Sequence, residues 1–244
     1  MGRVAKRRLA PLGVFLALAA TVSSLPVLRF YHSYWGQLTR LPAAVISHER
    51  AGGGRWIAAQ RVSPWLINAL VATEDRTFAS NFGISFEGIG RALLVDLRVH
   101  RFAQGGSTLT QQLARDTMLS PVKKFRRKID EALLAVAITG LYSKQKILTL
   151  YLNQVYWGGG AYGIYAASER YFGIPPQRLT LPEASLIAGL PQAPSAYNPL
   201  KHFRRAKVRQ WEVLQSMTAD HMITEQQARS AFRAPLALIR PADH

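Results

Sequence analysis

Apolar residues recur with a helical spacing along most of the chain. In residues 64–78, Leu66, Ala69 and Leu70 fall on one face of a helix that ends in a Glu-Asp pair. Similar runs occupy residues 107–119, 126–142, 144–157, 164–173, 180–190, 203–219 and 224–232. Convincing alternation of apolar and polar residues, the mark of a half-buried strand, is absent from the sequence. The pattern therefore predicts a mainly α fold, with one domain over residues 64–235.

Polar residues predict where several of these helices begin. Thr108 followed by Gln111 has the spacing of a capping box, and so does Thr180 followed by Glu183. Ser143 is a predicted N-cap, and the helix of residues 164–173 is expected to end at its glycine. The first of these boundaries places a Gly-Gly pair directly before a helix.

The N-terminal segment has a pattern of its own. Residues 1–8 are rich in cations, whereas residues 9–28 contain no charge. About 20 apolar residues suffice to span a bilayer as a helix, and cations before such a span favour a cytoplasmic N-terminus. We therefore predict a cytoplasmic tail, a transmembrane signal-anchor over residues 9–28 and an exported domain. A cleaved secretory signal is the alternative. Residues 29–63, interrupted by Pro42 and by Gly52–Gly54, are predicted to form a neck.

The charge of the chain indicates an anionic partner. There are 31 Lys and Arg residues against 14 Asp and Glu residues, a formal net charge of +17. Export argues against a nucleic acid. The chain has no cysteine, so disulfides and thiolate metal sites are excluded, and its six histidines lack the spacing of metal ligands.

Residues 84–102 combine an apolar stripe with cations. Phe86, Leu93, Leu94 and Leu97 share one helical face with Ile89, and Arg91, Arg98 and Arg101 can reach lipid headgroups. This pattern predicts docking on an anionic bilayer, and an ordinary core helix is the alternative.

Carboxylates are scarce, yet three stand in apolar surroundings. Glu74 and Asp75 end an apolar helix, and Glu131 lies where a charged turn meets an apolar run. Enzymes that act on glycosidic bonds usually use two carboxyl groups in different environments. The environments push the two pKa values apart, so that one group takes a proton and the other stabilises charge. Alternatively, Glu131 forms an ion pair with Arg127 four residues before it, and Glu74 caps a helix or forms a salt bridge.

The sequence GGSTLTQQ at residues 105–112 predicts an anion site. A Gly-Gly turn that leads into a helix presents free backbone N–H groups at the positive end of the helix dipole. It is not a P-loop, because the Gly-Lys-Ser/Thr ending is missing. The basic run at residues 123–128 could neutralise a phosphate. The alternatives are an ordinary helix cap and a solvated basic face.

Five segments in this order resemble one family. They are Glu74-Asp75-x-x-Phe78, GGSTLTQQ at 105–112, Arg127-Lys128-x-x-Glu131, residues 143–168 and PQAPSAYNP at 191–199. The order is similar to that of the peptidoglycan glycosyltransferases, found as the polymerising domain of class A penicillin-binding proteins and as stand-alone transglycosylases. The resemblance covers about residues 60–220 and is closest to the monofunctional enzymes, because later transpeptidase motifs are lacking.

This resemblance implies a lysozyme-like helical fold that polymerises lipid II with inversion and release of undecaprenyl pyrophosphate. Glu74 matches the general base that takes a proton from the acceptor hydroxyl, and Glu131 matches a second essential carboxylate. The substrate-binding residues implied are Asp75, Gly105, Gly106, Ser107, Thr108, Gln111, Gln112, Arg115, Lys123, Arg127 and Lys128. No cofactor and no metal ligand set are implied, and a divalent cation at the pyrophosphate is left open.

The resemblance also implies a location and partners. The expected location is the inner membrane of a bacterium, crossed once, with the catalytic domain on the extracytoplasmic side. The expected partners are lipid II, the growing lipid-linked glycan, an anionic membrane and other proteins of cell-wall synthesis and division, with no nucleic acid.

Some positions depart from the family pattern. The family usually has His at Asn81, Lys-Asn at Arg115-Asp116 and often a Glu near Gly140. Two alternative functions therefore stay open at this point. One is a lytic transglycosylase or lysozyme-like hydrolase, and the other is an inactive membrane-bound scaffold of the cell-wall machinery.

Overall fold

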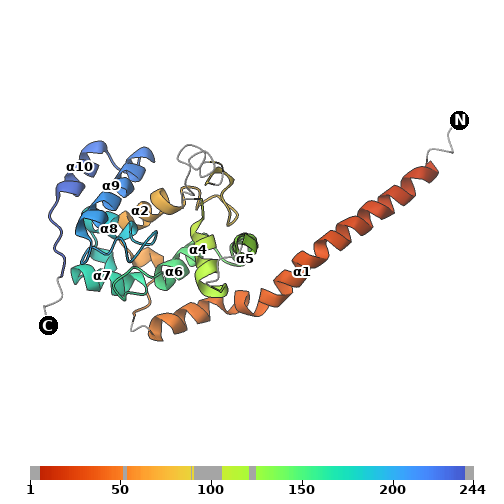
Figure 1. The fold of residues 1–244 in the computed structure, drawn as a ribbon, viewed down its shortest axis with the longest axis horizontal. Coiled ribbons are helices and arrows are strands. Elements are labelled where there is room, and N and C mark those ends of the chain that lie inside the picture. Colours follow the sequence, from red (N-terminus) through yellow and green to blue (C-terminus); the bar gives the residue numbers. More distant parts are fainter. Residues whose placement is uncertain (1–5, 52–53, 89, 91–105, 121–124, 240–244) are drawn as a thin grey trace. The chain divides into compact units, whose positions relative to one another are not determined.

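The structure, a computed structural model, describes residues 6–51, 54–88, 90, 106–120 and 125–239. Within these ranges the chain is helical, and the only β pairing is an isolated bridge between Tyr156 and Tyr162. The α-helices are α1 (Lys6–Ala51), α2 (Pro64–Glu74), α4 (Leu109–Met118), α5 (Phe125–Leu141), α6 (Lys144–Gln154), α7 (Ile164–Phe172), α8 (Leu181–Ala188), α9 (Phe203–Ala219) and α10 (Glu225–Arg233) (Figure 1). Short 3₁₀ turns, η1 and η2, cover Ala59–Arg61 and Pro176–Arg178. The predicted mainly α fold is confirmed.

The chain divides into two compact units, residues 1–40 and 41–244. Helix α1 begins in the first unit and contains the predicted membrane span, most of whose side chains lie outside the described part of the chain. Across the part that is described, no helix combines the length and the apolar character needed to cross a bilayer.

The predicted neck differs from the structure in two ways. Helix α1 continues through Pro42 to Ala51, so proline does not interrupt it. Leu41 and Val45 on this stretch are fully buried, and such packing overrides the poor helix propensity of proline. The second compact unit therefore begins well before the predicted boundary at residue 64.

Hydrogen bonds fasten the end of the neck to α6. The backbone N–H of Ile57 donates to Asn153 Oδ1 across 3.0 Å, and Asn153 Nδ2 donates back to the Ile57 carbonyl across 2.8 Å. The backbone N–H of Ala59 donates to Thr149 Oγ1 across 3.1 Å. These polar groups are buried, so each hydrogen bond avoids the free-energy cost of burying a polar group without a partner.

The core of the second unit places two helix ends together. Helix α2 packs against α8 and α9, while α4 packs against α5 and α6. Leu66, Ala69 and Leu70 of α2 are fully buried, as their spacing predicted. The C-terminal end of α2 and the N-terminal end of α4 carry the predicted site residues.

The predicted helix caps are confirmed, although the helix predicted over residues 144–157 ends at Gln154. Thr108 Oγ1 accepts from the N–H of Gln111, and the Thr108 N–H donates to Gln111 Oε1 across 3.0 Å. Glu183 Oε2 accepts from the Thr180 N–H across 2.8 Å. Ser143 caps α6. Gly173, at φ +64°, ends α7 in the left-handed conformation that glycine adopts without strain.

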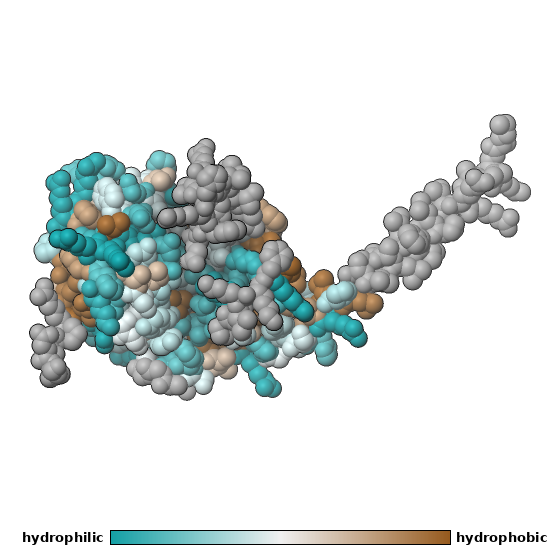
Figure 2. All heavy atoms as spheres, viewed as in Figure 1, coloured by the Kyte–Doolittle hydropathy of each residue, from teal (hydrophilic) through white to brown (hydrophobic). Residues whose placement is uncertain are grey.

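Hydrophilic residues cover much of the face drawn in Figure 2. Among the described residues, Phe82 and Phe86 are the most exposed large hydrophobic side chains, each with 78% of its surface exposed. The segment predicted to dock on the bilayer lies largely outside the described residues, because nothing is described between residues 91 and 105. Membrane docking stays a prediction.

Candidate active site

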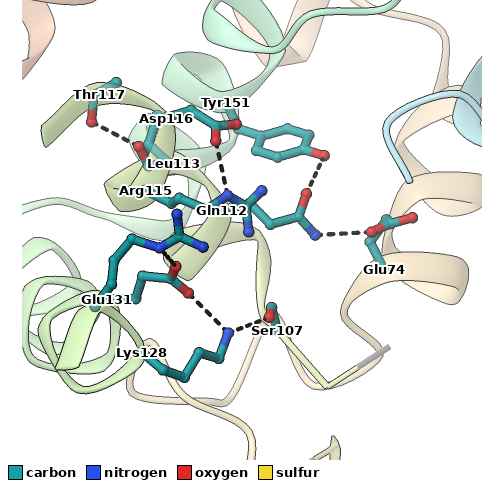
Figure 3. Close-up of polar contacts among 11 residues, drawn as sticks. Glu74, Ser107, Gln112, Leu113, Arg115, Asp116, Thr117, Lys128, Glu131 and Tyr151 are labelled. Carbon is teal, nitrogen blue, oxygen red and sulfur yellow. Dashed lines mark hydrogen bonds and ion pairs between the residues drawn. The ribbon is translucent and has the colours of Figure 1, made fainter. Parts of the chain in front are cut away.

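Glu74 is the last residue of α2, and its side chain is only 12% exposed. Its Oε2 accepts a hydrogen bond from Gln112 Nε2 of α4 across 2.8 Å (Figure 3). Its Oε1 lies 3.4 Å from Arg209 Nη2 of α9. Glu74 thus lies where three helices meet, held by one neutral donor and one cation.

Burial raises the pKa of the Glu74 carboxyl above its ordinary value. The hydrogen bond from Gln112 and the charges of Arg209 and Arg115 oppose this shift, and the charge of Asp75 adds to it. A carboxylate with a raised pKa is a stronger base than one in water. The environment therefore suits proton abstraction.

The carboxylate of Asp75 accepts hydrogen bonds from other residues of the protein. Its Oδ1 accepts from Asn81 Nδ2 across 2.8 Å and from the Thr77 hydroxyl, and its Oδ2 accepts from the Leu109 N–H across 3.1 Å. The residue is 4% exposed. Burial raises the pKa of Asp75, and these hydrogen bonds counteract the rise. The geometry shows that Asp75 joins α2 to α4, and the substrate contact predicted from the sequence stays a prediction.

Asn81 and Lys144 complete this network. Asn81 Oδ1 accepts from Lys144 Nζ across 2.8 Å and from the Gly83 N–H across 3.0 Å, while its Nδ2 donates to Asp75. Lys144 Nζ also lies 4.9 Å from the centre of the Phe78 ring. The amide at this departure from the family pattern therefore uses both its donor and its acceptor atoms. Lys144 was not among the site residues predicted from the sequence.

The glycine turn lies beside Glu74. Gly106, Ser107 and Thr108 line one cleft together with Glu74 and Asp75. Gly105 lies outside the described residues. The predicted anion site and the predicted base therefore share a cleft.

Thr108 and Gln111 act as helix caps. The Thr108 hydroxyl donates its proton to the Gly83 carbonyl across 2.6 Å, and Gln111 Oε1 accepts from the Thr108 N–H. Both residues are buried. The one hydroxyl proton of Thr108 is therefore used within the protein, and the predicted contact of Thr108 with a substrate stays a prediction.

Glu131 joins two predicted cations to the turn. It is 2% exposed on α5, and its oxygens lie 3.2 Å from Arg127 Nε and 2.9 Å from Lys128 Nζ. Lys128 Nζ also donates to Ser107 Oγ across 2.6 Å (Figure 3). The ion pair between Arg127 and Glu131, expected from their spacing, is present. Lys128 links this pair to the glycine turn. Lys123 lies outside the described residues.

Arg115 and Asp116 pair with each other. Arg115 Nε lies 3.0 Å from Asp116 Oδ1, and about a third of each side chain is exposed. Burial raises the pKa of Asp116, and Arg115 opposes the rise. Asp116, another departure from the family pattern, thus partly neutralises Arg115. Nothing in the structure explains the glycine at position 140, where an added Cβ would meet open space.

Two residues that contact the Glu74 network were missed from the sequence. Arg209 Nη1 also donates to Glu212 Oε2 across 2.8 Å, and Arg209 Nε donates to the Gly189 carbonyl across 3.4 Å. Tyr151, buried on α6, donates to Gln112 Oε1 across 3.2 Å. Arg209 lies outside the five segments that carry the family resemblance. Tyr151 lies within residues 143–168, but no spacing in the sequence relates it to Gln112. Over the described ranges, no cluster of three or more His, Asp or Glu side chains could hold a metal ion.

The segment that contains this site is similar to known proteins. The family model described as Transglycosylase matches residues 43–218. Penicillin-binding protein 1A of Aquifex aeolicus is 46% identical over 183 residues, which are 75% of this chain and 25% of that protein. Penicillin-binding protein 2D of Bacillus subtilis is 35% identical over 236 residues, which are 93% of this chain and 34% of that protein.

A solved structure is also similar over part of the chain. The crystal structure of Penicillin-Binding Protein 1A from Haemophilus influenzae has a TM-score of 0.39 and 39% identity, over 41% of this chain and 15% of that one. The chain spans a quarter to about a third of the length of the two curated relatives named above. Glu74, Glu131 and Arg209 all fall within the matched family segment.

Proposed function

Since this chain belongs to the transglycosylase family, we propose that it polymerises peptidoglycan glycan chains from lipid II. The reaction joins the 4-hydroxyl of an acceptor GlcNAc to C1 of the donor MurNAc. It forms a β-1,4 linkage with inversion and releases undecaprenyl pyrophosphate. Related domains in penicillin-binding proteins support this assignment.

Glu74 is the proposed general base. It takes the proton from the acceptor hydroxyl, and the oxygen attacks C1 from the face opposite the pyrophosphate. The observation that carries the proposal is the cleft that Glu74 shares with Gly106, Ser107 and Thr108. A base and a candidate anion site in one cleft are the two parts that a glycosyl transfer from a pyrophosphate donor needs.

The glycine turn and the cations of α5 are proposed to hold the leaving pyrophosphate. Lys128 contacts Ser107 of the turn, and both Lys128 and Arg127 form ion pairs with the carboxylate of Glu131. Negative charge grows on the leaving group during the reaction, and fixed donors and cations that face such charge are usually the largest catalytic contribution. Glu131 is proposed to orient both cations and to keep their charge balanced in the free enzyme.

The setting follows from the same proposal. We place the chain in a bacterial inner membrane, anchored by residues 9–28, with a lysozyme-like catalytic domain on the extracytoplasmic side. Its proposed partners are lipid II, the growing lipid-linked glycan, the anionic membrane surface and other cell-wall synthesis proteins. No cofactor is proposed.

Labelled lipid II tests the function. Incubation of the full chain in detergent micelles should give glycan chains longer than the substrate and release the lipid pyrophosphate. A lytic enzyme would instead shorten glycan strands from isolated sacculi. A scaffold would bind lipid II without turnover, so either result would contradict the proposal.

A further inference from the structure

The hydroxyl of Tyr151 lies two hydrogen bonds from Glu74. Tyr151 of α6 donates to Gln112 Oε1 across 3.2 Å, and Gln112 Nε2 of α4 donates to Glu74 Oε2 across 2.8 Å (Figure 3). Tyr151 is fully buried and Gln112 is 8% exposed. Residues of three helices thus form one chain of hydrogen bonds that ends on the carboxylate.

The orientation of the Gln112 amide decides which form of Glu74 it favours. The amide oxygen only accepts hydrogen bonds and the amide nitrogen only donates them. With its nitrogen toward Glu74, the amide stabilises the ionised carboxylate. With its oxygen toward Glu74, two acceptors would face each other, and only the protonated acid could be accommodated.

Tyr151 provides the donor that selects between these orientations. Burial, and then the nearby charges of Glu74 and Asp116, raise the pKa of Tyr151 well above its ordinary value. The phenol therefore keeps its proton and offers an O–H. A buried donor needs an acceptor, so the amide oxygen turns toward Tyr151 and the amide nitrogen toward Glu74.

We propose that Tyr151 is a positioning residue that fixes the amide of Gln112 and thereby holds Glu74 ionised and ready to accept a proton. The inference deepens the proposed function, because it rests on Glu74 as the base. It also changes the expected role of Gln112, from lining the donor site to holding the base.

The other charged groups around Glu74 act on its carboxylate in both directions. Arg209 of α9 and Arg115 of α4 favour the carboxylate, and neighbouring Asp75 disfavours it. Glu183 of α8 is bonded to Thr180 at the start of its own helix. Loss of the Tyr151 hydroxyl should therefore raise the pKa of Glu74 while the two arginines limit the rise.

The test compares Tyr151→Phe with Tyr171→Phe. Tyr171 is a matched control, because it is also buried and its hydroxyl donates to the Trp157 carbonyl across 3.0 Å. The pKa of Glu74 is measured by NMR titration of isotope-labelled glutamate carboxyls in the full chain in micelles. Glu74→Gln assigns the signal. We expect a raised Glu74 pKa in Tyr151→Phe and an unchanged value in Tyr171→Phe.

The pH dependence of lipid II turnover provides the second readout. In Tyr151→Phe the acidic limb of kcat should move to higher pH, and kcat at neutral pH should fall roughly 2- to 10-fold with KM retained, the equivalent of one lost hydrogen bond. A merely structural role would lower activity without moving the limb. Gln112→Met, which removes the donor itself, should raise the pKa of Glu74 at least as far.

Each outcome separates the two proposals. An unchanged Glu74 pKa in Tyr151→Phe overturns the inference, whatever Gln112→Met shows and whether or not the protein turns over lipid II. A raised pKa together with an unmoved kcat limb leaves the hydrogen-bond chain standing and removes Glu74 as the base. A wild-type protein without turnover contradicts the proposed function alone, since the titration still decides the inference.

Discussion

Asp75 accepts a hydrogen bond from the backbone N–H of Leu109, the first residue of α4, across 3.1 Å. The residue that follows Glu74 is thereby tied to the helix that carries Gln112. A free N–H at a helix start is satisfied by this carboxylate, which also complements the positive end of the helix dipole. This contact therefore ties the start of α4 to the residue next to the candidate base.

Replacing Asp75 with Ala should separate the two helix ends. The Leu109 N–H and the Asn81 amide would lose their buried acceptor, and each such loss costs about 1–3 kcal/mol. We expect a lower free energy of unfolding in urea, together with reduced lipid II turnover. Asp130→Ala, a partly exposed acid on α5, is the control for loss of one negative charge. Equal stability of the two variants would contradict this role of Asp75.

The amide of Asn81 should be essential to the same network. Asn81→Ala leaves Gly83 N–H, Lys144 and Asp75 without a shared partner, so the free energy of unfolding should fall by about 1–3 kcal/mol. Thermal and urea unfolding measure the effect. Ser80→Ala, at the exposed neighbour, should change stability by less than about 0.5 kcal/mol. A drop no larger than that of Ser80→Ala would show that the network contributes little.

Arg127→Ala should weaken binding at the donor site. A phosphoglycolipid inhibitor that resembles the donor carries the phosphate that Arg127 is proposed to meet. Removal of a charged hydrogen-bond donor should weaken binding roughly 10- to 100-fold. Arg229→Ala, which breaks the exposed pair with Glu225 on α10, removes the same charge elsewhere and should leave affinity unchanged. Wild-type affinity in folded Arg127→Ala would mean that the phosphate is held by other groups.

Thr108→Val should have a smaller effect on inhibitor binding than Arg127→Ala. The Thr108 hydroxyl donates to Gly83 and accepts from Gln111, so its loss removes a cap and not a ligand contact. Loss of an N-cap typically costs about 1 kcal/mol of stability. Calorimetric binding and urea unfolding on the same samples separate the two effects. A loss of affinity as large as that of Arg127→Ala would restore Thr108 as a substrate donor.

Glu74→Gln should stabilise the protein at neutral pH. Burial raises the pKa of Glu74 above 4.5, so the folded state holds this proton more tightly than the unfolded chain does. The stability that the protonated group contributes is complete below pH 4.5 and is lost as the pH rises through the folded-state pKa. The variant has no such proton to lose. Its advantage in urea unfolding should therefore grow from acidic to neutral pH, and an advantage independent of pH would contradict the burial argument.

The features that could be predicted from the sequence depend on residues that are close together along the chain. Helix periods and caps such as Thr108 with Gln111 depend on neighbours three or four residues apart, and the pair between Arg127 and Glu131 has the same range. These features were predicted from the sequence, and the structure confirms them. Helix α1 is the local exception, because burial of Leu41 and Val45 outweighs the proline between them.

Long-range contacts explain what the sequence could not reveal. Glu74 is 135 positions from Arg209, and Gln112 is 39 positions from Tyr151. No periodicity or cap joins residues so far apart, since only the packing of α2, α4, α6 and α9 brings them together. The same holds for Asn81 and Lys144, which are 63 positions apart. The sequence marked Asn81 only as a departure from the family pattern.

The turnover of labelled lipid II by Glu74→Gln, compared with wild type, tests the central claim most directly. The substitution keeps the shape of the side chain and removes its basicity. If Glu74 is the general base, the rate of glycan polymerisation should fall roughly 10²- to 10⁴-fold while the protein remains folded. Near-normal polymerisation by folded Glu74→Gln would show that another group takes the proton.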